Sequence, residues 1–471
     1  MSKWAYRFKT PPDYHQVLAL KNALKYKRYG IFFQQRVGKT KVAIDFCGVK
    51  YTSDNVRRVL IVCPLSVRSE WSAQIEEHLS KDVLGHTWVY TYPDTVTKQD
   101  QMYTAFSNIP ENDLVVSIIN YDKLTTQTER ILKWKPEIII FDESHLLKNH
   151  NSKRSKQAYK LSKATDSVLL LTGTPIPKHW YDIFSQFRVL NDRIFGSQWT
   201  KFRDKHAIMG GYMGKEIVGC KDYDYIADVI GQNSIRVLRK DVFDEPDVEF
   251  VTLPVELEKS AKQMYDNLRK QFVVELSNQQ TVTADMAVTR LMRLQQLCGG
   301  FTTTDEGDVI EVSTAKLNVL KDLVKTKIEG GEQVVIFYRF TAEGQAIHKM
   351  LGDMRINYGS INGSVSEDNR KHYRDFFQQG TLDAMAVQIA TGAMGISLDR
   401  AHINIFYSLD FSLSNFQQAR DRVMGRNQKN DVTNYMLAVD KTVDKKIMKT
   451  LEKDEDIASS ISDKWRVIFD E

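Results

Sequence analysis

The sequence predicts an α/β protein with two parallel sheets flanked by helices and with helical insertions. Between about residues 29 and 171, short apolar runs alternate with longer amphipathic stretches, which is typical of βαβ units. This alternation stops between about residues 180 and 314, where helical patterns dominate, and it resumes between 334 and 408. A chain of 471 residues with 42% hydrophobic and 27% charged residues is long enough for two large globular units.

The expected strands are largely apolar, as strands buried on both faces of a sheet should be. In the first unit they are residues 30–34, 59–63, 114–119, 137–141 and 167–171, and in the second 334–338, 356–361, 384–389 and 403–408. The acidic stretch 241–247 marks the expected boundary. We expect one domain at 1–243, with a helical extension from about 180, and a second at 244–471, with a helical protrusion at about 255–300.

The charge of the chain is informative through its distribution. Lys and Arg total 65 against 60 Asp and Glu, a net charge of only +5. Residues 1–50, however, hold eleven Lys or Arg, and a second basic run extends from Lys148 to Lys163 without an acidic residue. Each run is either a solvated helix face or a contact surface for phosphates.

The four cysteines are far apart and form no CxxC pattern. We therefore expect neither a zinc site nor a disulfide framework. No apolar stretch resembles a signal peptide or a membrane span. We therefore expect an intracellular, cytoplasmic protein with no membrane partner.

The turn after the first expected strand predicts a phosphate-binding loop. Residues 30–34 lead into Gln35-Arg36-Val37-Gly38-Lys39-Thr40, and a helical pattern follows. In such a loop the backbone N–H groups surround the phosphates, the lysine neutralises them and the hydroxyl reaches Mg²⁺. The pattern is incomplete, because Phe33 stands where the strict motif has its first glycine.

A pair of carboxylates is expected to act together with this phosphate-binding loop. Asp142 and Glu143 end the apolar run 138–141 and begin the sequence Asp-Glu-Ser-His. One carboxylate is expected to hold Mg²⁺ and the other to activate water. A buried strand that ends in two carboxylates without such a role would be costly.

The order of these motifs, followed by Thr172-Gly173-Thr174-Pro175, resembles the first lobe of superfamily 2 helicases and translocases, and the SWI/SNF-like branch in particular. The resemblance implies two RecA-like lobes, with ATP and Mg²⁺ as cofactors. It implies a nucleotide site formed by Gln16, Arg36, Val37, Gly38, Lys39 and Thr40, with Thr40 and Asp142 on the metal. It implies that Thr172, Gly173 and Thr174 couple hydrolysis to movement, and that Arg36 replaces the usual glycine.

The second half carries the remaining motifs of this family. The resemblance implies that Arg422 and Arg426 act as catalytic arginines, that Gly395 and Gln418 line the nucleotide, and that the segment from Thr442 to Ile447 begins a helix that braces the lobes. The implied nucleic-acid contacts are Pro64, Ser66, Asn120, Tyr121, Lys148, Tyr338, Arg339, Gly363, Ser364, Thr391 and Gly392.

The resemblance implies an ATP-dependent helicase or translocase on double-stranded or branched DNA, similar to compact phage or bacterial fork-remodelling and branch-migration enzymes. We expect a monomer that meets replication or recombination proteins. Two alternatives remain: a motor that displaces bound proteins without separating strands, and a nucleotide-gated DNA-binding module. Trp199, Tyr212 and Met213 are either core residues, which we favour, or a strand-separating wedge.

Overall fold

The computed structural model describes residues 6–177, 179–244, 246–278, 284–304, 308–391, 397–425 and 428–462. The chain divides into two compact units, Met1–Asp244 with Asp456–Glu471, and Glu245–Glu455. In the described part of the chain, none of the helices combines the length and the apolar character needed to span a bilayer.

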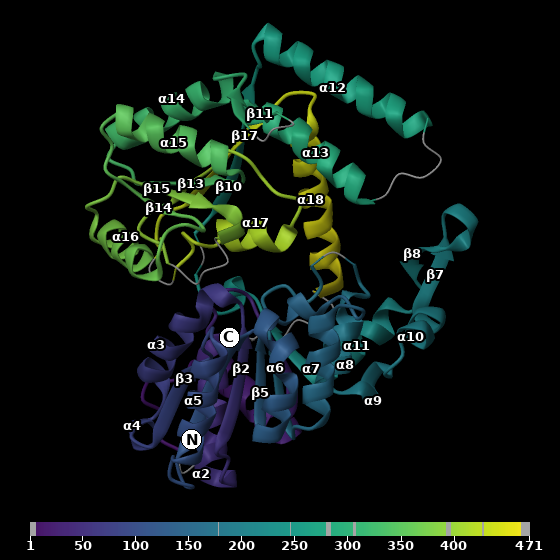
Figure 1. Ribbon diagram of the computed structural model, residues 1–471, viewed down its shortest axis with the longest axis vertical. Helices are drawn as coiled ribbons and strands as arrows, with labels where there is room; N and C mark the ends of the chain where they lie inside the picture. The colour runs from purple at the N-terminus through teal and green to yellow at the C-terminus, as the bar shows by residue number, and fades with distance from the viewer. Residues whose placement is uncertain are drawn as a thin grey trace. The chain divides into compact units, whose positions relative to one another are not determined.

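The first unit contains a parallel sheet of seven strands in the order β3-β4-β2-β5-β6-β1-β9 (Figure 1). The strands are β1 (Arg28–Phe33), β2 (Arg58–Cys63), β3 (Thr87–Thr91), β4 (Leu114–Asn120), β5 (Ile138–Asp142), β6 (Ser167–Leu171) and β9 (Ser234–Val237). The five strands expected from the sequence are all present. The edge strands β3 and β9 are additions, because β3 is only partly buried and β9 is very short.

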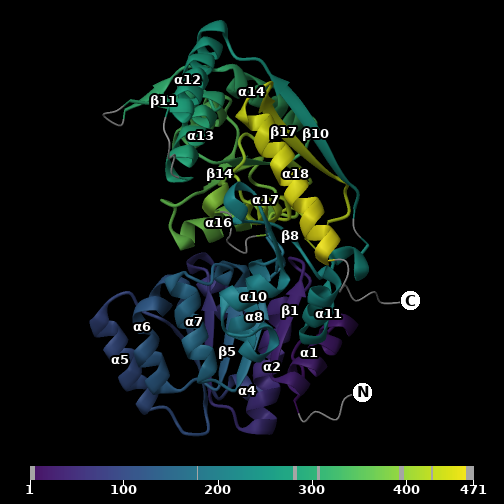
Figure 2. The ribbon, with the colours of Figure 1, turned by 90° about the vertical axis from the view of Figure 1, so that its right-hand side faces the viewer.

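Helices cover both faces of this sheet, as Figures 1 and 2 show. They are α1 (Tyr14–Tyr26), α2 (Lys39–Asp54), α3 (Arg68–His78), α4 (Lys81–Leu84), α5 (Val96–Ser107), α6 (Tyr121–Trp134), α7 (Lys153–Lys163), α8 (Asp182–Leu190), α9 (Asp192–Phe195), α10 (Trp199–His206) and α11 (Tyr223–Asn233). Successive residues of β1 alternate between two apolar clusters, with Ile31 and Phe33 facing α1 to α3 and Phe32 facing α6 to α8.

The second unit contains a parallel sheet of six strands in the order β10-β17-β16-β13-β15-β14. The strands are β10 (Val248–Val255), β13 (Val334–Tyr338), β14 (Tyr358–Ile361), β15 (Ala384–Gln388), β16 (Ile403–Phe406) and β17 (Val432–Val439). Its helices are α12 (Lys259–Asn278), α13 (Ala284–Cys298), α14 (Ala315–Glu329), α15 (Thr341–Asp353), α16 (Glu367–Gln379), α17 (Leu413–Arg420) and α18 (Val443–Ser462). Two parallel sheets flanked by helices confirm the predicted fold class.

The region expected to be helical also contains strands, which corrects the expectation. Besides β9 and β10, it holds two antiparallel hairpins, β7 (Ala207–Gly210) with β8 (Glu216–Cys220), and β11 (Phe301–Thr303) with β12 (Val309–Glu311). The expectation that Trp199 is a core residue agrees with the structure, since its ring stacks on His150 at 4.7 Å. For Met213 the expectation is wrong, because this side chain is 71% exposed in the turn between β7 and β8. The side chain of Tyr212 lies outside the described part of the structure.

Candidate nucleotide site

The loop between β1 and α2 has the tight backbone that phosphate binding requires. Gly38 caps the N-terminus of α2 at φ 88°, and Arg36 also adopts a left-handed conformation, at φ 64°. The Val37 N–H donates to the Gln34 carbonyl at 3.4 Å. Arg36 therefore fits a conformation in which glycine would be favoured. The N-terminal N–H groups of α2, and the positive end of its dipole, are available for an anion at this turn.

The Lys39 ammonium lies inside this loop. Its Nζ donates to the carbonyl oxygens of Phe33, at 3.0 Å, and of Gln34, at 3.3 Å. The side chain is buried, so its charge is held within the strand-to-helix turn rather than in solvent. Thr40 follows in the first turn of α2.

Gln16 reaches the same loop from α1. The Asp13 N–H donates to Gln16 Oε1 at 3.0 Å, and Gln16 Nε2 donates to the Val37 carbonyl at 3.5 Å. His15, which the sequence did not single out, donates to that carbonyl at 3.0 Å. A Cβ on Gly38 would lie only 2.2 Å from Gln16 Nε2. Gln16, Val37 and Gly38, which the resemblance assigned to the nucleotide, therefore lie next to one another.

The carboxylate pair stands at the end of β5. Asp142 Oδ2 accepts a hydrogen bond from Trp71 Nε1 at 2.8 Å, and Asp142 Oδ1 accepts one from the Glu143 N–H at 3.0 Å. Burial and the neighbouring Glu143 raise the pKa of Asp142 to about 7. Trp71, on α3, escaped the sequence reasoning because nothing in its local pattern links it to a residue 71 positions away.

Glu143 has the opposite pKa direction. Burial alone would raise its pKa, but hydrogen bonding and charge from His145, together with the charge of Lys39, lower it below the ordinary value. Lys39 also lowers the pKa of Asp142, so both carboxylates sense the ammonium of the phosphate loop. The pair thus combines a carboxyl whose pKa is raised, Asp142, with one whose pKa is lowered, Glu143.

The donor chemistry of the site fits Mg²⁺. Asp142 supplies carboxylate oxygens and Thr40 a hydroxyl, and Mg²⁺ prefers oxygen ligands. Throughout the described ranges, no group of three or more His, Cys, Asp or Glu side chains could hold a metal. Proteins usually bind Mg²⁺ through one or two carboxylates together with substrate phosphates.

A hydrogen-bonded triangle links the carboxylates to the loop after β6. His145 Nδ1 lies 3.1 Å from Glu143 Oε2 and 3.0 Å from Thr172 Oγ1, and the Thr172 hydroxyl donates to Glu143 Oε2 at 3.3 Å. The Thr174 N–H donates to the Thr172 hydroxyl at 3.1 Å. Gly173 lies against the phosphate loop, since a Cβ there would be 3.4 Å from the Gln35 nitrogen.

Several expected nucleic-acid contacts have internal partners instead. Asn120 accepts from the Lys123 N–H at 2.9 Å and caps α6. Tyr121 is 3% exposed and donates to the Asp142 carbonyl at 2.7 Å. Tyr338 is also buried, so the side chains of these three residues are not on the surface. By contrast Lys148 is exposed and Pro64 is half-buried at the end of β2, while the side chain of Ser66 is not described.

In the second unit, Arg422 is buried after α17, and its carbonyl accepts from the Leu398 N–H at 2.9 Å. Gln418 Nε2 donates to Ser414 Oγ at 3.4 Å. Gly392, Gly395 and Arg426 lie outside the described residues.

The expected nucleic-acid contacts of this unit are mixed in exposure. The Thr391 hydroxyl donates to Gln388 Oε1 at 3.1 Å, and Arg339 donates to Gln295 Oε1. Gly363 and Ser364 form an exposed turn, where the Ser364 hydroxyl donates to Asn362 Oδ1 at 2.7 Å.

A buried ion pair joins α14 to the segment from Thr442 to Ile447 that the sequence indicated. Lys316 Nζ lies 2.7 Å from Asp444 Oδ2, and their side chains are 1% and 6% exposed. Lys316 belongs to α14 and Asp444 to α18, within the part of α18 that packs in the second unit. The pair fixes the start of α18 on the second sheet.

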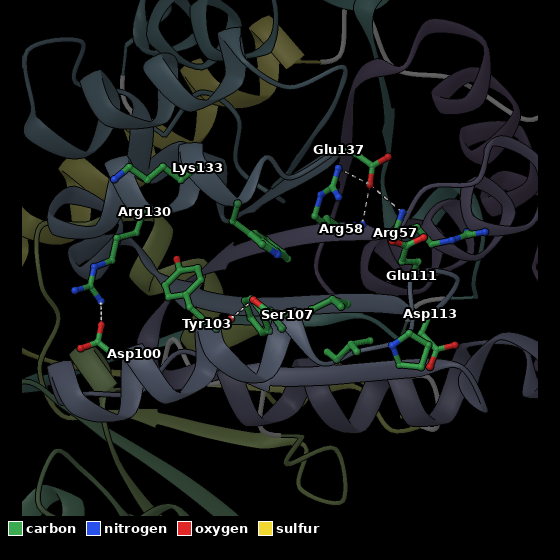
Figure 3. A pocket seen from close by; sticks show the side chains of 15 residues that line it. Arg57, Arg58, Asp100, Tyr103, Ser107, Glu111, Asp113, Arg130, Lys133 and Glu137 are labelled. Carbon is green, nitrogen blue, oxygen red and sulfur yellow. Dashed lines mark hydrogen bonds and ion pairs between the residues drawn. The ribbon is translucent and has the colours of Figure 1, made fainter.

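A separate cavity of about 870 Å³ lies at the amino ends of β2, β4 and β5 (Figure 3). Two of its carboxylates have protein partners: Asp100 pairs with Arg130 at 2.7 Å, and Glu137 accepts the N–H groups of Arg57 and Arg58. The phosphate loop and the carboxylate pair follow the carboxyl ends of their strands. The cavity is therefore at the opposite edge of the sheet and is not the nucleotide site.

Comparisons with known proteins agree with this geometry. The chain matches the SNF2-related domain over residues 16–300 and the helicase conserved C-terminal domain over residues 315–427. It is 24% identical to a Caenorhabditis elegans homolog of the SWI/SNF-related matrix-associated actin-dependent regulator of chromatin subfamily A-like protein 1, over 86% of this chain and 55% of that protein.

The chain is also 22% identical to the human DNA annealing helicase and endonuclease ZRANB3, over 89% of this chain and 38% of that protein. A solved structure of the Sulfolobus solfataricus SWI2/SNF2 ATPase core in complex with dsDNA aligns with a TM-score of 0.45 and 20% identity, covering 97% of this chain and 95% of that one. The chain spans about half the length, or less, of these two curated relatives. Because the first family model covers more than half of its residues, the chain belongs to the SNF2-related family of superfamily 2, with two RecA-like lobes.

Proposed function

We propose that this chain is an ATP-dependent DNA helicase or translocase that acts on double-stranded or branched DNA, in fork regression, branch migration or junction unwinding. The observation that carries the proposal is the order of three neighbouring strands. β5, β6 and β1 are adjacent, and their carboxyl ends lead into Asp142 and Glu143, the loop 172–174, and the phosphate loop. A phosphate loop and a carboxylate pair on one edge of a parallel sheet are the parts that NTP hydrolysis needs.

The residues of the first unit divide the work of hydrolysis. Lys39 exchanges its bonds to two carbonyl groups for bonds to phosphate when ATP binds, while Gln16 contacts the base. Thr40 and Asp142 hold Mg²⁺, which when bound supplies positive charge to the transferred phosphoryl group. Glu143 stays ionised and accepts a proton from the attacking water. Its Oε2 is held by His145 and Thr172, so the carboxylate has a fixed orientation.

The loop 172–174 is placed to respond to changes at Glu143 during this reaction. A change in the charge or position of Glu143 acts on the Thr172 hydroxyl, and Thr174 is bonded to the same hydroxyl. In the second unit, Arg422 is the candidate that stabilises charge on the transferred group. DNA as the track is supported by the family, by the name of the human relative and by exposed lysines of α7, a helix that presents Lys153, Lys156 and Lys160 to solvent.

The test is ATP turnover with single-stranded, duplex, forked and four-way DNA. DNA should stimulate turnover, and Glu143→Gln should lower it at least about 100-fold, since a general base contributes about 10²–10⁴ to rate. Nucleotide binding should survive Glu143→Gln but not Lys39→Ala. Turnover that is insensitive to Glu143→Gln would refute the mechanism.

Displacement of bound proteins without strand separation is the second candidate function. It is favoured by the Caenorhabditis elegans relative, whose name describes a chromatin regulator rather than a helicase. The two functions differ in a strand-displacement assay on forked and four-way DNA, because only the first releases a labelled strand from protein-free substrate.

A further inference from the structure

The hairpin of β7 and β8, residues 207–220, exposes apolar side chains that no part of the nucleotide site uses. Met213 is 71% exposed, Val218 60%, Ile208 45% and Met209 38%. Figure 1 shows this hairpin projecting beyond α10 of its own unit. Apolar side chains that gather on a projecting element mark an interaction site more often than a structural one.

The hairpin is held firmly at its base. His206, immediately before β7, is 3% exposed and its Nδ1 lies 2.8 Å from Asp222 Oδ2. The Lys221 N–H donates to the His206 carbonyl at 2.8 Å, and Ile217 packs against the apolar core. The apolar tip therefore stands on a base that is fixed to the first unit.

Two glycines make the hairpin thin. A Cβ on Gly210 would lie 2.9 Å from Val218 Cγ2, and a Cβ on Gly219 would lie 3.3 Å from Ile208 Cδ1. Val218 and Ile208 therefore lie across positions that have no side chain. A bulge between Ile208 and Met209 adds local twist. The hairpin is therefore narrow where it carries its exposed apolar side chains.

The charges around the hairpin are complementary to a polyanion. Residues 199–221 contain five Lys or Arg and two Asp or Glu, and Asp204 is paired with Arg203 at 2.6 Å. Lys201, Lys205, Lys215 and Lys221 are all exposed, and they precede and follow Met213 in the sequence. Apolar side chains flanked by cations match bases flanked by phosphates, and inserted apolar side chains are a known way to unstack bases.

We propose that the β7–β8 hairpin is a wedge that places Met213, Val218 and Ile208 against the bases at the branch point of forked or four-way DNA. This inference rests on the proposed function and names the element that gives the motor its preference for branches. The lysines contact phosphates on either side of the branch, and the apolar tip occupies the position of the first disrupted base pair.

The experiment compares Met213→Ser/Val218→Ser with Val96→Ser, a control on α5 whose side chain is 61% exposed in the same unit. The substrate is a fork with 2-aminopurine in the first base pair at the branch, and a linear duplex is the reference. We expect the hairpin variant to lose the increase in 2-aminopurine fluorescence and to remodel forks at least about tenfold more slowly. Its ATP turnover on linear duplex should stay within about twofold of the parent. Met213→Leu, with Val218 unchanged, keeps an apolar tip. This variant should retain both the fluorescence increase and the rate of fork remodelling.

The outcomes are separable. Fluorescence and fork remodelling that are unchanged in the hairpin variant would overturn the wedge proposal. A tip that binds a protein instead of DNA would give this same result. An equal loss of turnover on linear duplex would also overturn it, because the hairpin would then be a general DNA contact. If the parent protein shows no DNA-stimulated turnover, the proposed function itself fails and the wedge fails with it.

Discussion

Gly38→Ala tests whether Gln16 and the phosphate loop form one nucleotide site. A Cβ at this position would lie 2.2 Å from Gln16 Nε2, closer than any non-bonded contact permits, so the Gln16 amide must move. Its displacement removes about one or two hydrogen bonds to the base, each worth about 0.5–1.5 kcal/mol. ATP affinity should therefore fall roughly 2- to 140-fold, at about 1.4 kcal/mol per tenfold. The left-handed φ of 88° costs alanine a further ~1–2 kcal/mol of folding stability.

The assay is titration of a fluorescent ATP analogue, combined with thermal unfolding, in a double-variant cycle with Gln16→Ala. Once Gln16 is shortened, Gly38→Ala should change affinity by less than about twofold, because the clash has gone. Gly331→Ala is the matched control: its φ is +82°, and no atom lies within 4 Å of the added Cβ. It should lose stability without losing affinity. Additive losses of affinity in the double variant would refute the reasoning.

Three further predictions concern stability and DNA binding. Asp444→Asn should destabilise the second unit by about 3–5 kcal/mol, because it leaves the buried Lys316 charge unpaired, whereas Lys316→Met/Asp444→Leu should cost far less; urea unfolding measures both. Burial raises the pKa of Glu343, so the folded state holds its proton more tightly than the unfolded state. The stability that protonated Glu343 gives the folded state is fully present at pH below the ordinary pKa of 4.5 and is lost as pH rises through the raised pKa. Glu343→Gln should flatten this loss of stability with pH, as measured by unfolding curves taken across pH. Lys153→Ala/Lys156→Ala should reduce the slope of log affinity against log salt by about one unit per lost contact, and an unchanged slope would make this part of α7 a solvated face.

The strands that the sequence predicts share a property that the missed strands lack. β2, β4, β5 and β6 are runs of Val, Ile and Leu at the centre of the first sheet, where both faces are buried. β10 has a largely exposed edge and contains Pro254. β17 is interrupted by Asn434, which is buried because its side chain accepts from Asn404 at 2.9 Å. A buried polar pair between strands cannot be recognised until both partners are placed.

The same distinction holds in the nucleotide site. Lys39, Asp142 and Glu143 could be predicted because each lies beside the end of an apolar run, where the chain itself shows the position. Trp71 and His15 could not, because their roles depend on contacts between elements far apart in sequence. Tyr121 is a further case: the resemblance implied a nucleic-acid contact, and the structure shows its hydroxyl donating to the Asp142 carbonyl, a bond that the sequence did not indicate.

The bond between Tyr121 and Asp142 also bears on how the site changes during turnover. Asp142 is fixed at three atoms, by Trp71, by Tyr121 and by the Glu143 N–H, so its carboxylate is held in place before a metal arrives. The carboxylate of Glu143 is held at Oε2, by groups that also hold the loop after β6. A reaction that alters charge next to both carboxylates therefore acts on Asp142, which is held by three groups, and on Glu143, which is bonded to the loop after β6. In the proposed mechanism Asp142 keeps its position, and a displacement of Glu143 would pass through Thr172 to the loop that lies against Gln35 of the phosphate loop.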